Sequence, residues 1–179
     1  FEFHERKGDF YFTASRFVEY KNINIIIKAF NRLPGRRLVI AGQGPLEKYL
    51  KRLAGPNIEF LGWVTEEKLI YYMQRAKAFL NASVEDFGIA GLEAQSTGTP
   101  VIALGKGGYR ETVIENKTGL FFEREHPEAL ADAILRFERM ELDPRVIREN
   151  AKRFDHQVFR EQFLNFFLDK SILHVEEMA

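Results

Sequence analysis

Two cations, Arg16 and Lys21, stand five residues apart just after an apolar run. If both side chains point into one crevice, they can bind an anion such as a phosphate, and the N-terminus of a following helix adds positive potential. The spacing alone leaves a plainer alternative open. Both residues can belong to a solvated loop, as two of the 26 Lys and Arg residues of the chain.

Two carboxylates, Glu85 and Glu93, stand eight residues apart around the expected start of a helix. The backbone N–H groups at such a start have no partner in the helix, so an anion such as pyrophosphate fits there. These N–H groups belong to Gly88, Ile89 and Ala90. The two acids would then accept hydrogen bonds from sugar hydroxyls on either side of a diphosphate. One capping acid and one exposed helical acid remain an equal alternative.

Three further loops could contact a ligand, and each has a plain structural alternative. Glycines let the backbone approach a ligand closely, but they also simply turn a chain. The only Trp can stack on a flat ligand or fill a half-buried loop position. The residues in question are Gly42 and Gly44, Trp63, and Gly107 and Gly108.

All of these residues follow short apolar runs that alternate with segments of helical period. This alternation predicts an α/β domain with a Rossmann-like parallel sheet of six strands, right-handed crossovers, and helices on both faces. Ligands bind outside the carboxyl ends of the strands in such sheets, which is where these loops fall. The expected strands are Phe10–Ala14, Leu38–Ala41, Ile58–Leu61, Ala78–Asn81, Val101–Leu104 and Gly119–Phe122.

The chain divides into three parts on this basis. Residues 1–9 are expected to be the remnant of a linker, and residues 10–142 the sheet domain. Residues 143–179 are purely helical in pattern, with helices expected at 146–154 and from residue 156 to about 173. Four Phe residues crowd the last helix, which we expect to pack on the domain or to reach toward another part of a larger protein. They are Phe159, Phe163, Phe166 and Phe167.

Composition excludes several classes of function. The 179 residues contain no Cys, which rules out disulfides, thiolate zinc sites and a Cys nucleophile. Lys plus Arg balance Asp plus Glu at 26 each, so a general nucleic-acid binder is not expected. No apolar stretch approaches the ~18 residues of a membrane span. P-loop, dinucleotide and G-x-S-x-G signatures are absent, and no His pair has metal-ligand spacing.

Seven motifs in unbroken order resemble the C-terminal, donor-binding half of family-four retaining GT-B glycosyltransferases, most closely the mannosyltransferases of surface-polysaccharide assembly. The motifs are S-R-x-x-x-x-K at 15–21, G-x-G-P at 42–45, F-L-G at 60–62, E-x7-E at 85–93, G-x-P-V-I-A at 98–103, G-G-x-x-E at 107–111 and a Gly-Leu-Phe strand at 119–121. The sequence departs from the pattern at Gly91, where related chains often carry Pro or a bulkier residue.

The resemblance implies a role for each of these residues. Arg16 and Lys21 would hold the donor diphosphate, and Glu85 would bind hydroxyls of the transferred sugar. Glu93 would bind the ribose. The remaining implied donor-binding residues are Gly42, Gly44, Trp63, Val64, Phe87, Gly88, Ile89, Ala90, Gly107 and Gly108.

The resemblance further implies retaining transfer of a hexosyl group, with GDP-mannose the favoured donor and neither a cofactor nor a metal required. The acceptor, a carbohydrate or a lipid-linked sugar, would bind an N-terminal domain that precedes Phe1. A cytoplasmic place, peripheral to the inner face of a membrane, is expected for the whole protein. The alternatives are a non-catalytic nucleotide-sugar binding module, a glucosyltransferase that uses a UDP-sugar, and an epimerase or phosphorylase of the same architecture.

Overall fold

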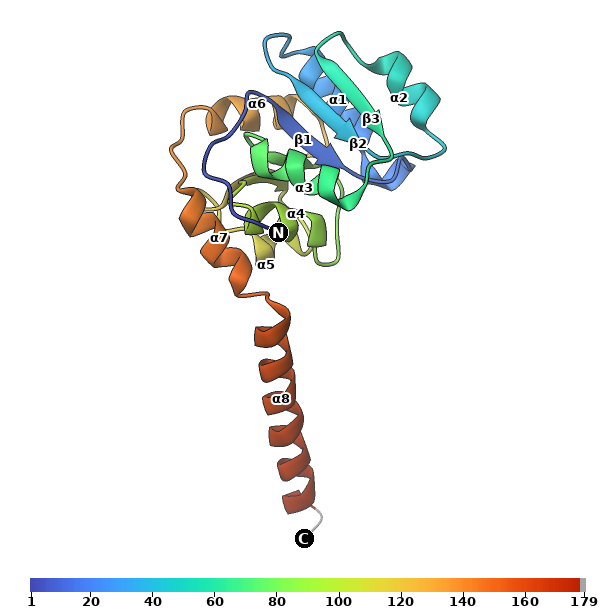
Figure 1. Cartoon of the computed structure of the whole chain (residues 1–179). Coiled ribbons are helices and arrows are strands. Elements are labelled where there is room, and N and C mark those ends of the chain that lie inside the picture. The colour runs from blue at the N-terminus through green and yellow to red at the C-terminus, as the bar shows by residue number, and fades with distance from the viewer. Residues whose placement is uncertain (178–179) are drawn as a thin grey trace.

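Six parallel strands form one sheet in the order β3-β2-β1-β4-β5-β6, and helices cover both of its faces (Figure 1). This computed structural model describes residues 1–177, with side chains described for residues 1–168. The order reverses between β1 and β4, which confirms the predicted Rossmann-like topology. The strands are β1 (Tyr11–Ala14), β2 (Leu38–Ala41), β3 (Ile58–Gly62), β4 (Phe79–Asn81), β5 (Val101–Leu104) and β6 (Gly119–Phe122).

The helices divide between two apolar cores, one on each face of the sheet. Helices α1, α2 and α6 bury their apolar faces in one core, and α3, α4 and α5 contribute to the other. Neighbouring residues of β2 and of β5 alternate between these cores, and most positions of the six strands are apolar. The helices are α1 (Ile23–Asn31), α2 (Glu47–Leu53), α3 (Glu66–Arg75), α4 (Ile89–Ser96), α5 (Tyr109–Thr112), α6 (Pro127–Phe137), α7 (Pro144–Lys152) and α8 (His156–Glu177), with a short 3-10 turn, η1 (Glu19–Lys21), before α1.

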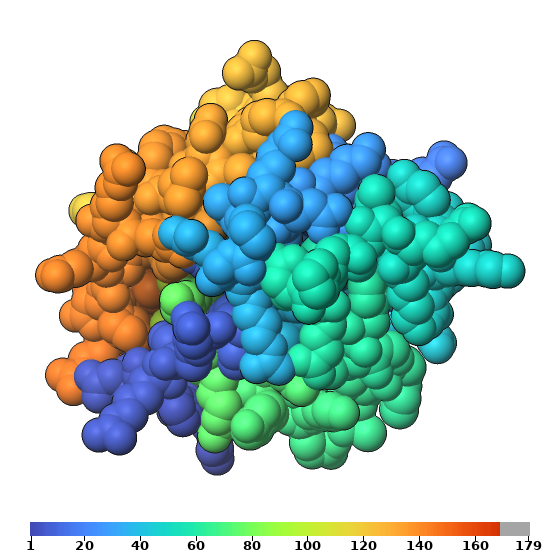
Figure 2. All heavy atoms as spheres, turned by 90° about the horizontal axis from the view of Figure 1, so that it is seen from above, coloured from blue at the N-terminus to red at the C-terminus, as the bar shows by residue number. Residues whose placement is uncertain are grey.

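The N-terminal segment, residues 1–9, lies against the domain. The Lys7 ammonium donates to the carbonyl oxygens of Gln74 and Thr97 and to the Thr99 hydroxyl, at 3.0, 3.3 and 2.8 Å. Burial lowers the pKa of Lys7 to about 8. In Figure 2 this dark-blue segment lies beside the orange atoms of α7, where the Arg148 guanidinium stands over the Phe3 ring. The segment therefore connects the C-terminal ends of α3 and α4 to α7.

The two C-terminal helices differ in how they relate to the domain. Helix α7 packs on α4 through the buried side chains of Ile147 and Asn150. It begins at Pro144, two residues before the predicted start, because Pro suits a first helical turn and the Asp143 carboxylate accepts from the N–H of Arg145. Helix α8 extends away from the domain (Figure 1). None of the helices in the described part of the chain combines the length and apolarity needed to cross a bilayer.

Candidate functional site

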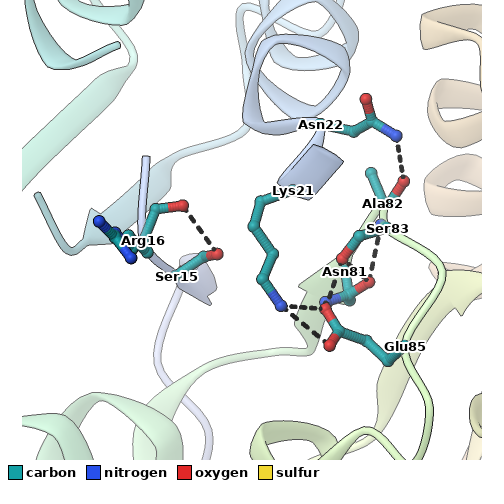
Figure 3. Close-up of polar contacts among 8 residues, drawn as sticks. All are labelled: Ser15, Arg16, Lys21, Asn22, Asn81, Ala82, Ser83 and Glu85. Carbon is teal, nitrogen blue, oxygen red and sulfur yellow. Dashed lines mark hydrogen bonds and ion pairs between the residues drawn. The ribbon is translucent and has the colours of Figure 1, made fainter. Parts of the chain in front are cut away.

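The loops after β1 and β4 bring a cation and a carboxylate together at the carboxyl edge of the sheet. Lys21 lies in η1, and Glu85 lies between β4 and α4. The Lys21 ammonium is 2.6 Å from one Glu85 carboxylate oxygen and 2.9 Å from the other (Figure 3). Because both side chains are only about a fifth exposed, at 20% and 21%, solvent screens this pair less than a surface ion pair.

Neighbours on β4 and in its loop hold the Glu85 carboxylate in place. The Ser83 hydroxyl donates to one carboxylate oxygen at 2.6 Å, and the Asn81 amide donates to the same oxygen at 3.4 Å. Asn81 in turn accepts from the backbone N–H of Ser83 at 2.8 Å (Figure 3). Burial favours the protonated acid, but the hydrogen bonds from Lys21, Ser83 and Asn81 outweigh it and hold the pKa of Glu85 below its usual value. Glu85 is therefore ionised and oriented at neutral pH.

Arg16 stands in the same loop region with its charge free. Among the residues that the structure describes, none forms a hydrogen bond or an ion pair with the Arg16 guanidinium. Figure 3 shows this group directed away from the ion pair of Lys21 and Glu85. A free, exposed guanidinium next to an existing ion pair leaves one positive charge available to an anionic ligand.

The start of α4 faces the same place with free backbone donors. Gly88 adopts a left-handed conformation, with φ of 83°, and the helix begins at Ile89. The first helical hydrogen bonds run from the N–H groups of Gly91 and Leu92 to the Gly88 carbonyl. Within the described chain, the preceding N–H groups, including those of Ile89 and Ala90, have no acceptor. They are the unpaired donors that a helix start offers to an anion.

Two adjacent hollows share one wall, formed by Ala14, Ser15 and Arg16. The first has a volume of about 380 Å³, and we call it the β4 hollow. Its lining includes Arg16, Lys21, Asn81, Glu85, Phe87, Gly88, Ile89, Ala90 and Tyr109. The second has a volume of about 580 Å³, and we call it the β2 hollow. Its lining includes Gly42, Gln43, Gly44, Glu47, Trp63, Val64 and Leu69.

Glycine is required where the β2 hollow meets β1. Gly42 has φ of 131°, and a Cβ there would overlap the carbonyl oxygen of Ser15. A Cβ on Gly44 would lie 2.6 Å from the Phe17 carbonyl oxygen. The two loops therefore pack backbone against backbone, and the same glycines leave the hollow open.

Three predicted site residues lie outside the lining of both hollows, as far as the described residues define it. The backbone N–H of Gly108 donates to the Glu85 carbonyl at 2.7 Å, so Gly107 and Gly108 support the Glu85 loop from behind. Glu93 is half-buried on the second turn of α4. Burial, and then the charge of Glu66, raise the pKa of Glu93.

Asn81 and Tyr109 line the β4 hollow and Ser83 holds Glu85 beside it, and none of these three polar residues was predicted as a site residue from the sequence. Asn81 and Ser83 adjoin Glu85 in the chain, and two polar side chains at the end of a buried strand were a signal that could have revealed them. Tyr109 carried no such signal, because only the packing of α5 under α4 brings it to the hollow. In the described residues no group of three or more His, Asp or Glu side chains has a metal-binding arrangement.

The chain is similar in sequence to known proteins. Residues 2–154 match the family described as Glycosyl transferases group 1. The GDP-mannose-dependent alpha-(1-6)-phosphatidylinositol monomannoside mannosyltransferase of Mycobacterium tuberculosis is 34% identical over 137 residues, which are 67% of this chain and 36% of that protein. The D-inositol 3-phosphate glycosyltransferase of Corynebacterium urealyticum is 41% identical over 119 residues, 61% and 28% of the two chains. The chain thus spans about a third of the length of these curated relatives.

Solved structures share the fold. The lipopolysaccharide outer core galactosyltransferase WaaB superposes with a TM-score of 0.82 at 20% identity, over 94% of this chain and 52% of its own. The catalytic domain of cholesterol-alpha-glucosyltransferase from Helicobacter pylori superposes with a TM-score of 0.69 at 24% identity, over 83% of this chain and all of its own, 100%. The predicted Rossmann-like half of a GT-B fold is thereby confirmed. Since the matched residues include all six strands, the chain belongs to the glycosyl transferase group 1 family.

Proposed function

We propose that this chain is the donor-binding domain of a retaining hexosyltransferase and that it binds a nucleoside diphosphate sugar across the two hollows. One observation carries the proposal. The β4 hollow gathers the free guanidinium of Arg16, the ion pair of Lys21 and Glu85, and the unpaired N–H groups at the start of α4. Cations and free N–H groups suit a diphosphate, and an oriented carboxylate suits sugar hydroxyls.

The two hollows divide the donor between them in this proposal. The diphosphate lies against Arg16, Lys21 and the start of α4, and the sugar lies toward Glu85. The nucleoside occupies the β2 hollow, with the base near Trp63 and Val64. The shared wall supports this division, because a ligand that bridges the hollows must pass Arg16.

The proposed chemistry is stabilisation of the leaving nucleoside diphosphate. Breaking the glycosidic bond moves negative charge onto the leaving phosphate oxygen and leaves an oxocarbenium-like sugar. Positive groups fixed in advance lower that barrier, and removal of one such group typically slows turnover by ~10²–10³-fold. We propose that Arg16 and Lys21 supply this charge without a metal ion. The contact between Lys21 and Glu85 holds the ammonium close to the position where it acts.

GDP-mannose is the proposed donor, with a UDP-sugar as the alternative. The Mycobacterium tuberculosis relative, which is named for GDP-mannose, supports the choice. We further propose that the carbohydrate or lipid-linked acceptor binds an N-terminal domain, and that the whole protein acts in the cytoplasm. Because the chain spans about a third of its relatives, transfer by these 179 residues alone is not expected.

A panel of GDP-, UDP- and ADP-sugars tests donor binding by thermal shift. A ligand at 100 times its dissociation constant stabilises the folded chain by about 2.7 kcal/mol, so the bound donor raises the melting temperature. Arg16→Ala should weaken binding by about ten- to hundredfold, as loss of a hydrogen bond to a charged group does. Arg160→Ala, which removes an exposed cation from α8, is the matched control and should bind like the wild type. Absence of any shift with every sugar nucleotide would disprove the proposal.

A non-catalytic binding module is the competing function, and turnover separates the two. In the full-length protein, Lys21→Ala should reduce turnover by ~10²-fold or more if Lys21 stabilises the leaving group. Tight donor binding together with unchanged turnover in that variant would remove the proposed role of Lys21.

A further inference from the structure

One buried hydroxyl beside the proposed donor site, that of Tyr109, has no role in the function proposed above. Tyr109 begins α5 and is 0% exposed, and it forms part of the lining of the β4 hollow. Its ring lies under the first turn of α4. A Cβ built on Gly88 would lie 3.0 Å from the ring, and a Cβ on Gly91 would overlap it. Glycines at these two positions thus allow the helix start and the phenol to lie in direct contact.

The hydroxyl has a donor proton and nowhere to place it. No side chain or carbonyl among the described residues forms a hydrogen bond with the Tyr109 oxygen. The nearby N–H of Gly91 already donates to the Gly88 carbonyl at 3.0 Å. Buried polar groups without partners are rare and costly, and Phe would fill the same space without this cost. The unpaired hydroxyl therefore points to a partner that arrives from outside the chain.

The protonation of the phenol matches such a partner. Burial, and then the charge of Glu85, raise the pKa of Tyr109, so the group stays neutral and keeps its proton at physiological pH. A neutral phenol donates to an oxygen that carries negative charge or a lone pair. The groups around it are hydrogen-bond donors too, namely the backbone N–H groups at the start of α4 and the side chains of Arg16 and Lys21. All of them suit the same negatively charged ligand.

We propose that Tyr109 is a donor-binding residue, whose hydroxyl donates a hydrogen bond to an oxygen of the nucleotide sugar at the first turn of α4. The oxygen belongs to the diphosphate or to the hexose. This inference rests on the proposed function and adds one residue to its site. In a buried, low-dielectric position a hydrogen bond to a charged oxygen is strong, so the phenol contributes affinity that the exposed Arg16 does not duplicate.

Two Tyr-to-Phe variants of the present chain test the inference. Tyr109→Phe keeps the ring and removes the unpaired hydroxyl. Tyr11→Phe is the matched control, since Tyr11 is also buried but its hydroxyl donates to Glu138 at 3.1 Å, at the amino end of β1 and away from the site. Melting temperature without ligand and dissociation constants by calorimetry are measured for both, with the wild type as reference. The probes are GDP-mannose, GDP and pyrophosphate, together with UDP-glucose.

The two variants should behave in opposite ways. Tyr109→Phe should keep or raise the melting temperature of the empty chain and weaken donor binding by about ten- to hundredfold. Tyr11→Phe should lower the melting temperature and bind like the wild type. A loss with pyrophosphate and GDP as well as with the sugar nucleotide places the bond on the diphosphate, and a loss with the sugar nucleotide alone places it on the hexose.

Failure of the inference differs from failure of the proposed function. If the wild type binds a sugar nucleotide and Tyr109→Phe binds it equally well, Tyr109 has no such role and the proposed function stands. A fall in the melting temperature of empty Tyr109→Phe, with unchanged affinity, would assign the hydroxyl to the fold. If the wild type binds none of the probes, the proposed function fails and the role of Tyr109 falls with it.

Discussion

At the scale of single residues, Glu85 contributes both to the stability of the fold and to the proposed donor site. Its carboxylate accepts from Lys21, Ser83 and Asn81, and these contacts also fix its orientation in the β4 hollow. Replacing it with Gln leaves the Lys21 ammonium partly buried without its counter-charge. Such a loss costs about 1.5–3 kcal/mol of the free energy of unfolding at pH 7, since hydrogen bonds to charged groups contribute about that much.

The cost of Glu85→Gln should depend on pH. The pKa of Glu85 in the folded state lies below its usual value of 4.5. The stabilisation is therefore complete above pH 4.5 and is lost as pH falls through the folded-state pKa. Urea unfolding should show a lower free energy of unfolding for the variant than for the wild type at pH 7, and this difference should narrow below pH 4.5. Glu138→Gln is the control, because Arg36 and Tyr11 lower the pKa of Glu138 away from the site, so donor binding should survive. A difference in the free energy of unfolding that stays constant down to pH 3.5 would contradict this account.

At the scale of elements, the strands could be predicted from the sequence and their mutual contacts could not. Short apolar runs between helical segments located all six strands to within one residue, because strands covered on both faces are mostly apolar. Thr13, Glu59 and Asn81 are the polar exceptions. The general rule for parallel sheets also indicated which loops share an edge. The Lys21–Glu85 pair, 64 residues apart in sequence, depends on side-chain packing that no local pattern encodes.

Gly91 illustrates the same limit within one helix. Helix propensity alone ranks Ala above Gly by about 1 kcal/mol, so Gly91→Ala should stabilise α4. The structure predicts the reverse, because the added Cβ would overlap the ring of Tyr109. We expect a melting temperature several degrees lower, as overpacking a core costs ~1–3 kcal/mol.

Gly35→Ala is the matched control for Gly91→Ala. No atom lies within 4 Å of a Cβ built on Gly35, so this variant should melt close to the wild type. A melting temperature of Gly91→Ala that equals or exceeds that of the wild type would mean that Tyr109 and α4 can separate at little cost. The close contact on which the role of Tyr109 depends would then be in doubt.

At the scale of the whole molecule, the sheet domain and α7 form one packed unit, and α8 stands apart from it (Figure 1). Helix α7 is connected to the core by Asn150, whose amide donates to the Gln95 side chain at 2.7 Å and to the Thr112 carbonyl at 2.8 Å. In contrast, Phe159 and Phe163 on α8 are exposed and stack on each other, with ring centroids 6.0 Å apart. None of the described side chains of α8, residues 156–168, is part of the buried core.

Truncation should separate these two helices by their effect on stability. A chain of residues 1–155 keeps α7 and Phe154, which packs on Phe87 beside the β4 hollow. It should melt within about 2 °C of the full chain, since the described side chains of α8, residues 156–168, bury little apolar surface. A chain of residues 1–142 also loses the buried Ile147 and Asn150, which costs several kcal/mol and lowers the melting temperature by roughly 10 °C.

Donor binding should persist in the chain of residues 1–155, because every residue assigned to the two hollows is retained. A large drop for the 1–155 chain would mean instead that α8 belongs to the folding unit, and its exposed aromatic side chains would need a contact within this chain.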